Sequence, residues 1–162
     1  MLGLIYVPLC ATICRHNYII EVKYMVITFC GHSKFQKNAG DEKKILSILE
    51  KEVGNKSCDA YLGDFGEYDM FAYHCCKKYK ESHPNLVLVF VTPYLNVSKH
   101  HNVEFYDDVL YPPIERKPLR YAISYRNQYM VEKADLIIAY VAHPWGGAYQ
   151  TCNRTGLEPI RF

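Results

Sequence analysis

Two runs of hydrophobic residues, LVLVFV at 86–91 and LIIAYV at 136–141, constrain the fold of this chain more than any other feature. Neither run alternates polar with apolar residues, which is the pattern of a strand buried on both faces of a sheet. Such strands are typical of parallel sheets that helices cover on both sides. The two runs therefore favour an α/β fold.

The segments around these runs alternate between strand and helix patterns. We expect strands at 26–30, 59–62, 86–91, 136–141 and 159–162, and helices at 41–53, 67–82, 119–133 and 148–154. Asp41 is the N-cap candidate of the first helix, and residues 94–117 are expected to be irregular. Because helices separate the strands, the connections are right-handed crossovers and the sheet is mainly parallel. The sequence thus predicts a three-layer Rossmann-like α/β sandwich.

The chain of 162 residues is 49% hydrophobic, which suffices for one domain with a buried core. Its net charge of +2 makes a nucleic-acid partner an unfavoured interpretation, and no apolar stretch has the 18 residues of a transmembrane helix. The cysteines lack the paired spacing of a zinc site, so we expect reduced thiols, no metal, no cofactor and a cytoplasmic location. A homo-oligomer stays open. The seven cysteines are Cys10, Cys14, Cys30, Cys58, Cys75, Cys76 and Cys152.

The first 24 residues differ in pattern from the rest of the chain. Residues 1–14 are apolar with Pro8 in the middle, and Met25 directly precedes the first expected strand. We therefore interpret 1–24 as a loosely attached extension and 25–162 as a single domain. An extra edge strand is the second interpretation, and a signal peptide is the third.

Glycine-bearing turns follow three of the expected strands. They contain Gly31-His32 after the first strand, Gly63 and Gly66 after the second, and Trp145-Gly146-Gly147 after the one at 136–141. Parallel sheets bind ligands outside the carboxyl ends of their strands. Two of these turns lead into a helix, where backbone N–H groups favour an anion. The alternative is that the glycines serve turn geometry alone.

Several polar and aromatic residues near these turns have two interpretations each. Asp69, in the first turn of the helix at 67–82, either compensates the helix dipole or contacts a ribose or a base. His32 either fixes its loop by hydrogen bonding or takes part in a ligand site. Trp145 either stacks on a base or plugs its loop. The common dinucleotide and P-loop fingerprints are absent from the chain.

Arg126 and Asn127 are unexpected on the helix at 119–133. Arg126 lies on the edge of the apolar face and Asn127 lies inside it, although a helix packed on a sheet should be apolar there. In one interpretation, Arg126 binds a phosphate or a carboxylate with its planar guanidinium. In the other, it ties the helix to a loop carbonyl or to Asp135. The residues of this face are Leu119, Ala122, Ile123, Met130 and Ala134.

Taken in order, the segments VITFCGHS, YLGDFGEYDMFA, ISYRNQYMVEKADLIIAYV and WGGAYQT resemble the YpsA-like branch of the SLOG superfamily. These Rossmann-like domains are related to the DprA and LOG proteins, and the resemblance covers about residues 25–162. It implies a pocket for a nucleotide or a nucleotide-derived molecule at the carboxyl ends of the strands. Arg126, in R-x-x-x-M, corresponds to an arginine of the enzyme members.

The chain departs from those enzymes in the glycine loop. Their P-G-G-x-G-T-x-x-E carries the glutamate of a phosphoribohydrolase, and the corresponding residue here is Asn153. Asparagine cannot act as an acid or a base. We therefore expect a binding or sensor domain for a nucleotide-like small molecule without turnover. The alternatives are a LOG-like hydrolase that uses Asp69 or Glu67 and, third, a single-stranded DNA binder of the DprA type.

Overall fold

The computed structural model describes residues 24–96, 103–154 and 156–161. Apart from Tyr24, the predicted N-terminal extension lies outside the described residues, so its attachment stays a prediction. Within the described part, no helix has the length and apolar character that a membrane crossing requires.

One six-stranded sheet forms the centre of the fold, and every pair of neighbouring strands in it is parallel. The strand order is β4-β3-β2-β1-β5-β6. The strands are β1 (Met25–Gly31), β2 (Cys58–Leu62), β3 (Leu86–Val91), β4 (Asp108–Leu110), β5 (Leu136–Tyr140) and β6 (Ile160–Arg161). The predicted fold class, a three-layer Rossmann-like sandwich, is confirmed.

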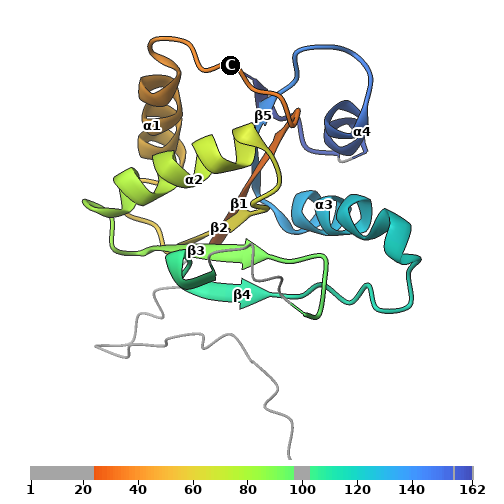
Figure 1. The fold of residues 1–162 in the computed structure, drawn as a ribbon. Helices are drawn as coiled ribbons and strands as arrows, with labels where there is room; N and C mark the ends of the chain where they lie inside the picture. Colours follow the sequence, from red (N-terminus) through yellow and green to blue (C-terminus); the bar gives the residue numbers. More distant parts are fainter. Residues whose placement is uncertain (1–23, 97–102, 155, 162) are drawn as a thin grey trace, which may run out of the picture.

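Helices cover both faces of the sheet (Figure 1). Helices α1 and α2 lie together on one face, and α3 and α4 lie on the other. The helices are α1 (Asp41–Glu52), α2 (Glu67–Lys80), α3 (Ala122–Lys133) and α4 (Gly147–Asn153), with short 3-10 turns η1 (Val103–Phe105) and η2 (Leu119–Tyr121). The main core lies between the sheet and the α1/α2 layer and includes Ile27, Leu49 and Phe71.

Two expectations about the helix beginnings were wrong. The N-cap of α1 is Gly40, with φ +99°, and Asp41 is the first residue of the helix. The Asp41 carboxylate accepts a hydrogen bond from the Asn38 N–H at 2.8 Å, so it closes the preceding turn. Helix α3 begins at Ala122 because the chain from Pro118 first forms a 3-10 turn.

The segment 94–117 contains a strand that the sequence did not reveal. β4 has only three residues, and it pairs with the end of β3 through Val89, Phe90 and Val91. Its side chains are exposed or half-buried, so no apolar run marks it in the sequence. The strand closes the edge of the sheet next to β3.

The order of the strands creates one crevice at their carboxyl ends. From β1 the chain proceeds through β2 and β3 to β4 in one direction, and it then crosses to β5 on the other side of β1. Connections from β1 and β5 therefore leave the sheet in opposite directions. Ligands of open α/β sheets bind at this kind of switch point.

Candidate ligand-binding site

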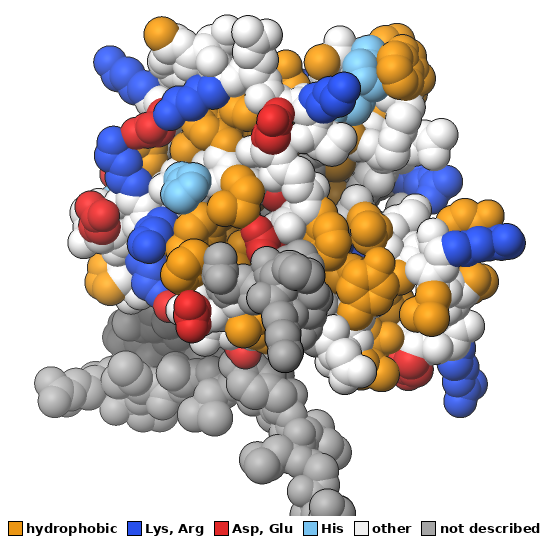
Figure 2. All heavy atoms as spheres, viewed as in Figure 1, with side chains coloured by type: hydrophobic (Ala, Val, Ile, Leu, Met, Phe, Trp, Pro, Cys, Tyr) orange, Lys and Arg blue, Asp and Glu red, His pale blue; other side chains and the backbone are white. Residues whose placement is uncertain are grey.

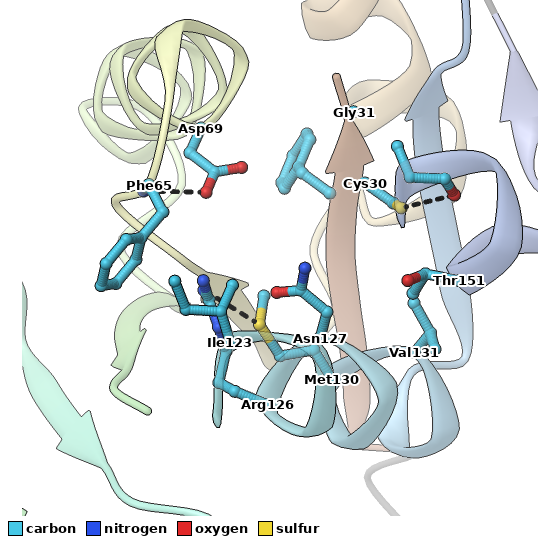
Figure 3. Close-up of a pocket in the computed structure, with 12 residues that line it drawn as sticks. Cys30, Gly31, Phe65, Asp69, Ile123, Arg126, Asn127, Met130, Val131 and Thr151 are labelled. Carbon is cyan, nitrogen blue, oxygen red and sulfur yellow. Dashed lines mark hydrogen bonds between the residues drawn. The ribbon is translucent and has the colours of Figure 1, made fainter. Parts of the chain in front are cut away.

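A small cavity lies at the switch point, among the end of β1, the loop into α2, and helices α3 and α4 (Figure 3). Its volume is about 50 Å³, which holds a few water molecules or one group of phosphate size. We call it the Arg126 pocket. It is lined by Phe29, Cys30, Gly31, Phe65, Asp69, Ile123, Arg126, Asn127, Met130, Val131, Ala148 and Thr151.

Arg126 extends from α3 into this space, and its side chain is 1% exposed. The guanidinium carbon lies 4.9 Å from the centre of the Phe65 ring, and Nη1 lies 3.6 Å from the Met130 sulfur. Among the described residues, the Arg126 Nε–H has no hydrogen-bond acceptor, and no carboxylate forms an ion pair with the guanidinium within 4.0 Å. Burial lowers the pKa of Arg126, and Asp69 and Asp64 oppose that shift.

Asp69 faces the same cavity from the other side (Figure 3). It is the third residue of α2, and its Oδ2 accepts a hydrogen bond from the Phe65 N–H at 2.9 Å. Burial raises the pKa of Asp69, although the nearby Arg126 charge lowers it. The pocket therefore presents a cationic donor and a carboxylate acceptor that do not pair directly with each other.

Gly63 and Gly31 make room for large neighbouring side chains. A Cβ at Gly63 would overlap the Arg126 guanidinium and would lie 2.7 Å from Asp69 Oδ2. A Cβ at Gly31 would overlap the ring of Tyr68, which is 1% exposed and donates its hydroxyl to the Ile138 carbonyl at 3.1 Å. Gly63 thus allows the position of Arg126, and Gly31 allows the packing of Tyr68.

His32 ties the end of β1 to the loop after β5. Its Nδ1 accepts a hydrogen bond from the Ala142 N–H at 3.2 Å, which leaves the proton on Nε2 for the Trp145 carbonyl, also at 3.2 Å. The His143 ring lies 3.7 Å from the His32 ring and is stacked 3.6 Å from Trp145. Trp145 is 66% exposed, so the stack ends at the protein surface.

The two glycine turns differ in what their backbones require. Gly66, the N-cap of α2, has φ +122° and packs against the Ser33 backbone, whose carbonyl accepts the Glu67 N–H at 2.9 Å. In the other turn, Gly146 has φ +91°, whereas Gly147 has no positive φ and no neighbour at its Cβ position. The positive φ of that turn is therefore at Gly146.

Four of the ten predicted site residues line the Arg126 pocket, namely Gly31, Asp69, Arg126 and Asn127. Gly63 lies directly beside it. The remaining five, His32, Gly66, Trp145, Gly146 and Gly147, belong to the surrounding loops and do not line the cavity.

Three expectations about the helix predicted at 119–133 are corrected. The carboxylate of Asp135 accepts the Val26 N–H at 2.8 Å, near the amino end of β1, so it is not the partner of Arg126. Leu119 and Ile123 were expected on the buried face, but they are 77% and 40% exposed. Arg126, expected at the edge of that face, is instead among its most buried residues.

Sequence reasoning missed several residues of the pocket wall. Phe65, inside G-D-F-G, was not among the predicted residues, although an aromatic residue between two glycines in a loop is a usable signal. Thr151 had no such signal, because its role depends on how α4 packs. Asn153 is exposed and lies outside the cavity.

A wider groove runs along α2 and the segment 35–42, with an apolar floor that includes Phe35 and Phe71. Figure 2 shows hydrophobic side chains at the surface over α2 and towards the start of α3, among Lys and Arg. The acidic groups of the groove are already paired. Glu42 binds Lys37 and Lys78, and Glu67 accepts the Phe35 N–H. The Arg126 pocket, which holds a buried Nε–H without an acceptor among the described residues, is therefore the better candidate site.

Comparisons with known proteins assign no family to this chain. No protein-family model matches the chain, and no curated protein matches it. A search of solved structures finds the X-ray structure of TM1055, a structural-genomics target, with a TM-score of 0.42 and 8% sequence identity. The match covers 71% of this chain and 59% of the TM1055 chain.

Within the described residues, no group of three or more His, Cys, Asp or Glu side chains could hold a metal ion.

Proposed function

We propose that this chain is a binding domain that recognises a nucleotide or a nucleotide-derived molecule through an anionic group held by Arg126. The observation that carries the proposal is the buried guanidinium whose Nε–H has no acceptor among the described residues. Burying a charge without a hydrogen-bonded partner costs several kcal/mol. An oxyanion in the pocket would supply that partner.

The chemistry of the pocket limits what the ligand can be. A cavity of about 50 Å³ accepts a phosphate or a carboxylate but not a whole nucleotide, so the rest of the ligand has to lie outside it. Asp69 adds a hydrogen-bond acceptor next to the guanidinium, which suits a hydroxyl or an N–H of the same ligand. A phosphorylated sugar or a nucleoside monophosphate offers both groups. The resemblance to the YpsA-like branch of the SLOG superfamily favours the same class.

Binding without turnover is the proposed activity. The residue that corresponds to the glutamate of the hydrolases is Asn153, which is exposed and outside the pocket. An amide at that position cannot transfer a proton. The domain would then act as a sensor whose ligand links α2 to α3.

Thermal unfolding with and without ligand tests the proposal. The full chain is titrated with AMP, ribose 5-phosphate and inorganic phosphate, with adenosine as the uncharged control. A ligand at 100 times its Kd should stabilise the fold by about 2.7 kcal/mol. Arg126→Met should abolish the stabilisation, while Lys133→Met, which removes an exposed cation from the same helix, should leave it intact. Equal stabilisation of both variants would contradict the proposal.

A LOG-like hydrolase is the second candidate, and Asp69 is the observation that favours it. This carboxylate faces the same cavity as Arg126, and burial raises its pKa, which is the direction that a general acid needs. Incubation with nucleoside monophosphates separates the two functions. Free base that forms with the wild-type chain and not with Asp69→Asn would establish turnover.

A further inference from the structure

Two cysteines meet beside the Arg126 pocket. Cys30 lies near the end of β1, and its sulfur points towards α4, where it lies 3.4 Å from the Ala148 carbonyl oxygen (Figure 3). Cys152 follows Ala148 by four residues in α4, so both face the same side of that helix. The two thiols share one buried cluster, and each lies close enough to shift the pKa of the other.

Their position differs from that of the other described cysteines. Cys58, Cys75 and Cys76 belong to the core on the opposite face of the sheet. Cys75 and Cys76 are adjacent in α2, so their side chains diverge around the helix. Cys30, by contrast, lines the Arg126 pocket, and Thr151 next to Cys152 lines it too. A small oxidant that enters the pocket therefore meets Cys30 in its wall, with Cys152 directly behind it in the same buried cluster.

We propose that Cys30 and Cys152 are a redox-modification site that forms a reversible intramolecular disulfide when a peroxide enters the pocket. A thiolate of the pair attacks one peroxide oxygen, and the O–O bond breaks, which gives a sulfenic acid and hydroxide. The second sulfur then attacks the sulfenic sulfur. The S–S bond forms, the S–O bond breaks and the hydroxyl leaves as water with the proton of the second thiol. Two thiols and one hydrogen peroxide thus give one disulfide and two waters.

The surroundings shift the pKa values of the two thiols in opposite directions. The hydrogen bond from Cys30 lowers the pKa of Cys152, and the positive charge of Arg161 acts in the same direction. The pKa of Cys30 is raised, first by its hydrogen bond with Cys152 and then by burial. Of the two thiols, Cys152 is therefore the one that loses its proton more readily. Thiolate is the form that reacts with oxidants.

A disulfide here would connect β1 to α4. Because Cys30 is part of the pocket wall, the bond would also reshape the site. Its effect on ligand affinity rests on the proposed function, whereas formation of the bond does not.

Peptide mapping of the full chain tests the proposal. Folded protein is treated with hydrogen peroxide, the remaining thiols are alkylated after denaturation, and the products are digested with trypsin. Residues 24–34 and 134–154 are tryptic peptides that carry one cysteine each, Cys30 and Cys152. We expect these two peptides to be linked after oxidation and to separate with dithiothreitol. If both remain fully alkylated, or if each links only to other cysteines, the proposal is overturned.

Two cysteine variants and an oxidation in the presence of AMP complete the experiment. In Cys152→Ser, Cys30 should lose its linkage, and Cys76→Ser should keep the wild-type pattern as the matched buried control. The wild-type linkage itself needs no variant, so a folding defect in Cys152→Ser would not spoil the test. AMP that slows the linkage supports an occupied pocket. Linkage at an equal rate with saturating AMP would contradict the proposed function and would leave the disulfide proposal standing.

Discussion

Replacing Arg126 with methionine should keep or increase stability while it removes ligand binding. Methionine has a similar length and no charge, and it adapts to irregular gaps. The replacement loses the contact between the guanidinium and the Phe65 ring, worth about 0.5–2 kcal/mol. It also removes a buried charge whose desolvation costs several kcal/mol and whose Nε–H has no partner in the described residues.

The removed desolvation cost is larger than the lost contact with Phe65, so Arg126→Met should be at least as stable as the wild type. Exchanging buried charged groups for apolar residues of similar volume is often neutral or stabilising by about 1–4 kcal/mol. We expect the unfolding free energy of Arg126→Met to equal that of the wild type or to exceed it by up to about 2 kcal/mol. For a domain of this size, that is a rise in Tm of up to about 8 °C.

Asp69 is the residue most affected by the replacement, because it loses the favourable charge of Arg126. Its Oδ2 keeps the hydrogen bond from the Phe65 N–H, and it can take up a proton. The double variant Arg126→Met/Asp69→Asn removes this complication and should be at least as stable as the single variant.

Differential scanning calorimetry without ligand, followed by a phosphate or AMP titration, gives both quantities. A stable variant without binding is the expected result. A loss of more than about 3 kcal/mol without ligand is the size expected when a buried charge loses its partner. That result would show that Arg126 is a structural residue with a partner and would refute the reasoning.

Three further predictions follow from the described geometry. Gly146→Ala should cost about 1–3 kcal/mol because φ is +91° there, while Gly147→Ala, as its control, should change stability by less than about 0.5 kcal/mol in the same melting assay. Deleting residues 1–24 should leave Tm within a few degrees, because β1 begins at Met25, and loss of soluble protein would contradict this. Since burial raises the pKa of Asp69, its contribution to stability is present below the ordinary value of 3.8 and is lost as pH rises through the raised value. Relative to Asp69→Asn, the wild type should therefore gain stability as pH falls from the raised value to 3.8. Relative to Asp41→Asn, the wild type should lose stability as pH falls below 3.8 through the lowered pKa of Asp41, which the hydrogen bond from the Asn38 N–H causes. Chemical unfolding of the three proteins at several pH values measures both slopes.

The sheet was predictable because its central strands are buried on both faces. The runs at 86–91 and 136–141 are hydrophobic throughout, and the structure turns them into β3 and β5. β4 was not predicted, because an exposed edge strand of three residues needs no apolar pattern. Its position depends on pairing with β3, which is a long-range effect that local sequence does not encode.

The site was only partly predictable for a related reason. Arg126 and Asp69 stand out in sequence because a charged residue at an apolar or helix-start position has to be explained. The Phe65 ring, which lies against the guanidinium, comes from a different layer of the fold. His32 stands out in the sequence through its place after β1, but its hydrogen bonds to Ala142 and Trp145 depend on the path of the loop after β5.

The Arg126 pocket takes part of its wall from each helical layer, and this has a mechanical consequence. Asp69 lies in the first turn of α2 on one face of the sheet, while Arg126 extends from α3 on the other. The carboxylate and the guanidinium do not form an ion pair with each other across the gap. A ligand that accepts from Arg126 and donates to Asp69 would supply the missing connection. Binding would then raise the stability of both layers at once. The disulfide of Cys30 and Cys152 would act on a third side, between β1 and α4, so that oxidation and ligand would adjust the same cavity from different walls.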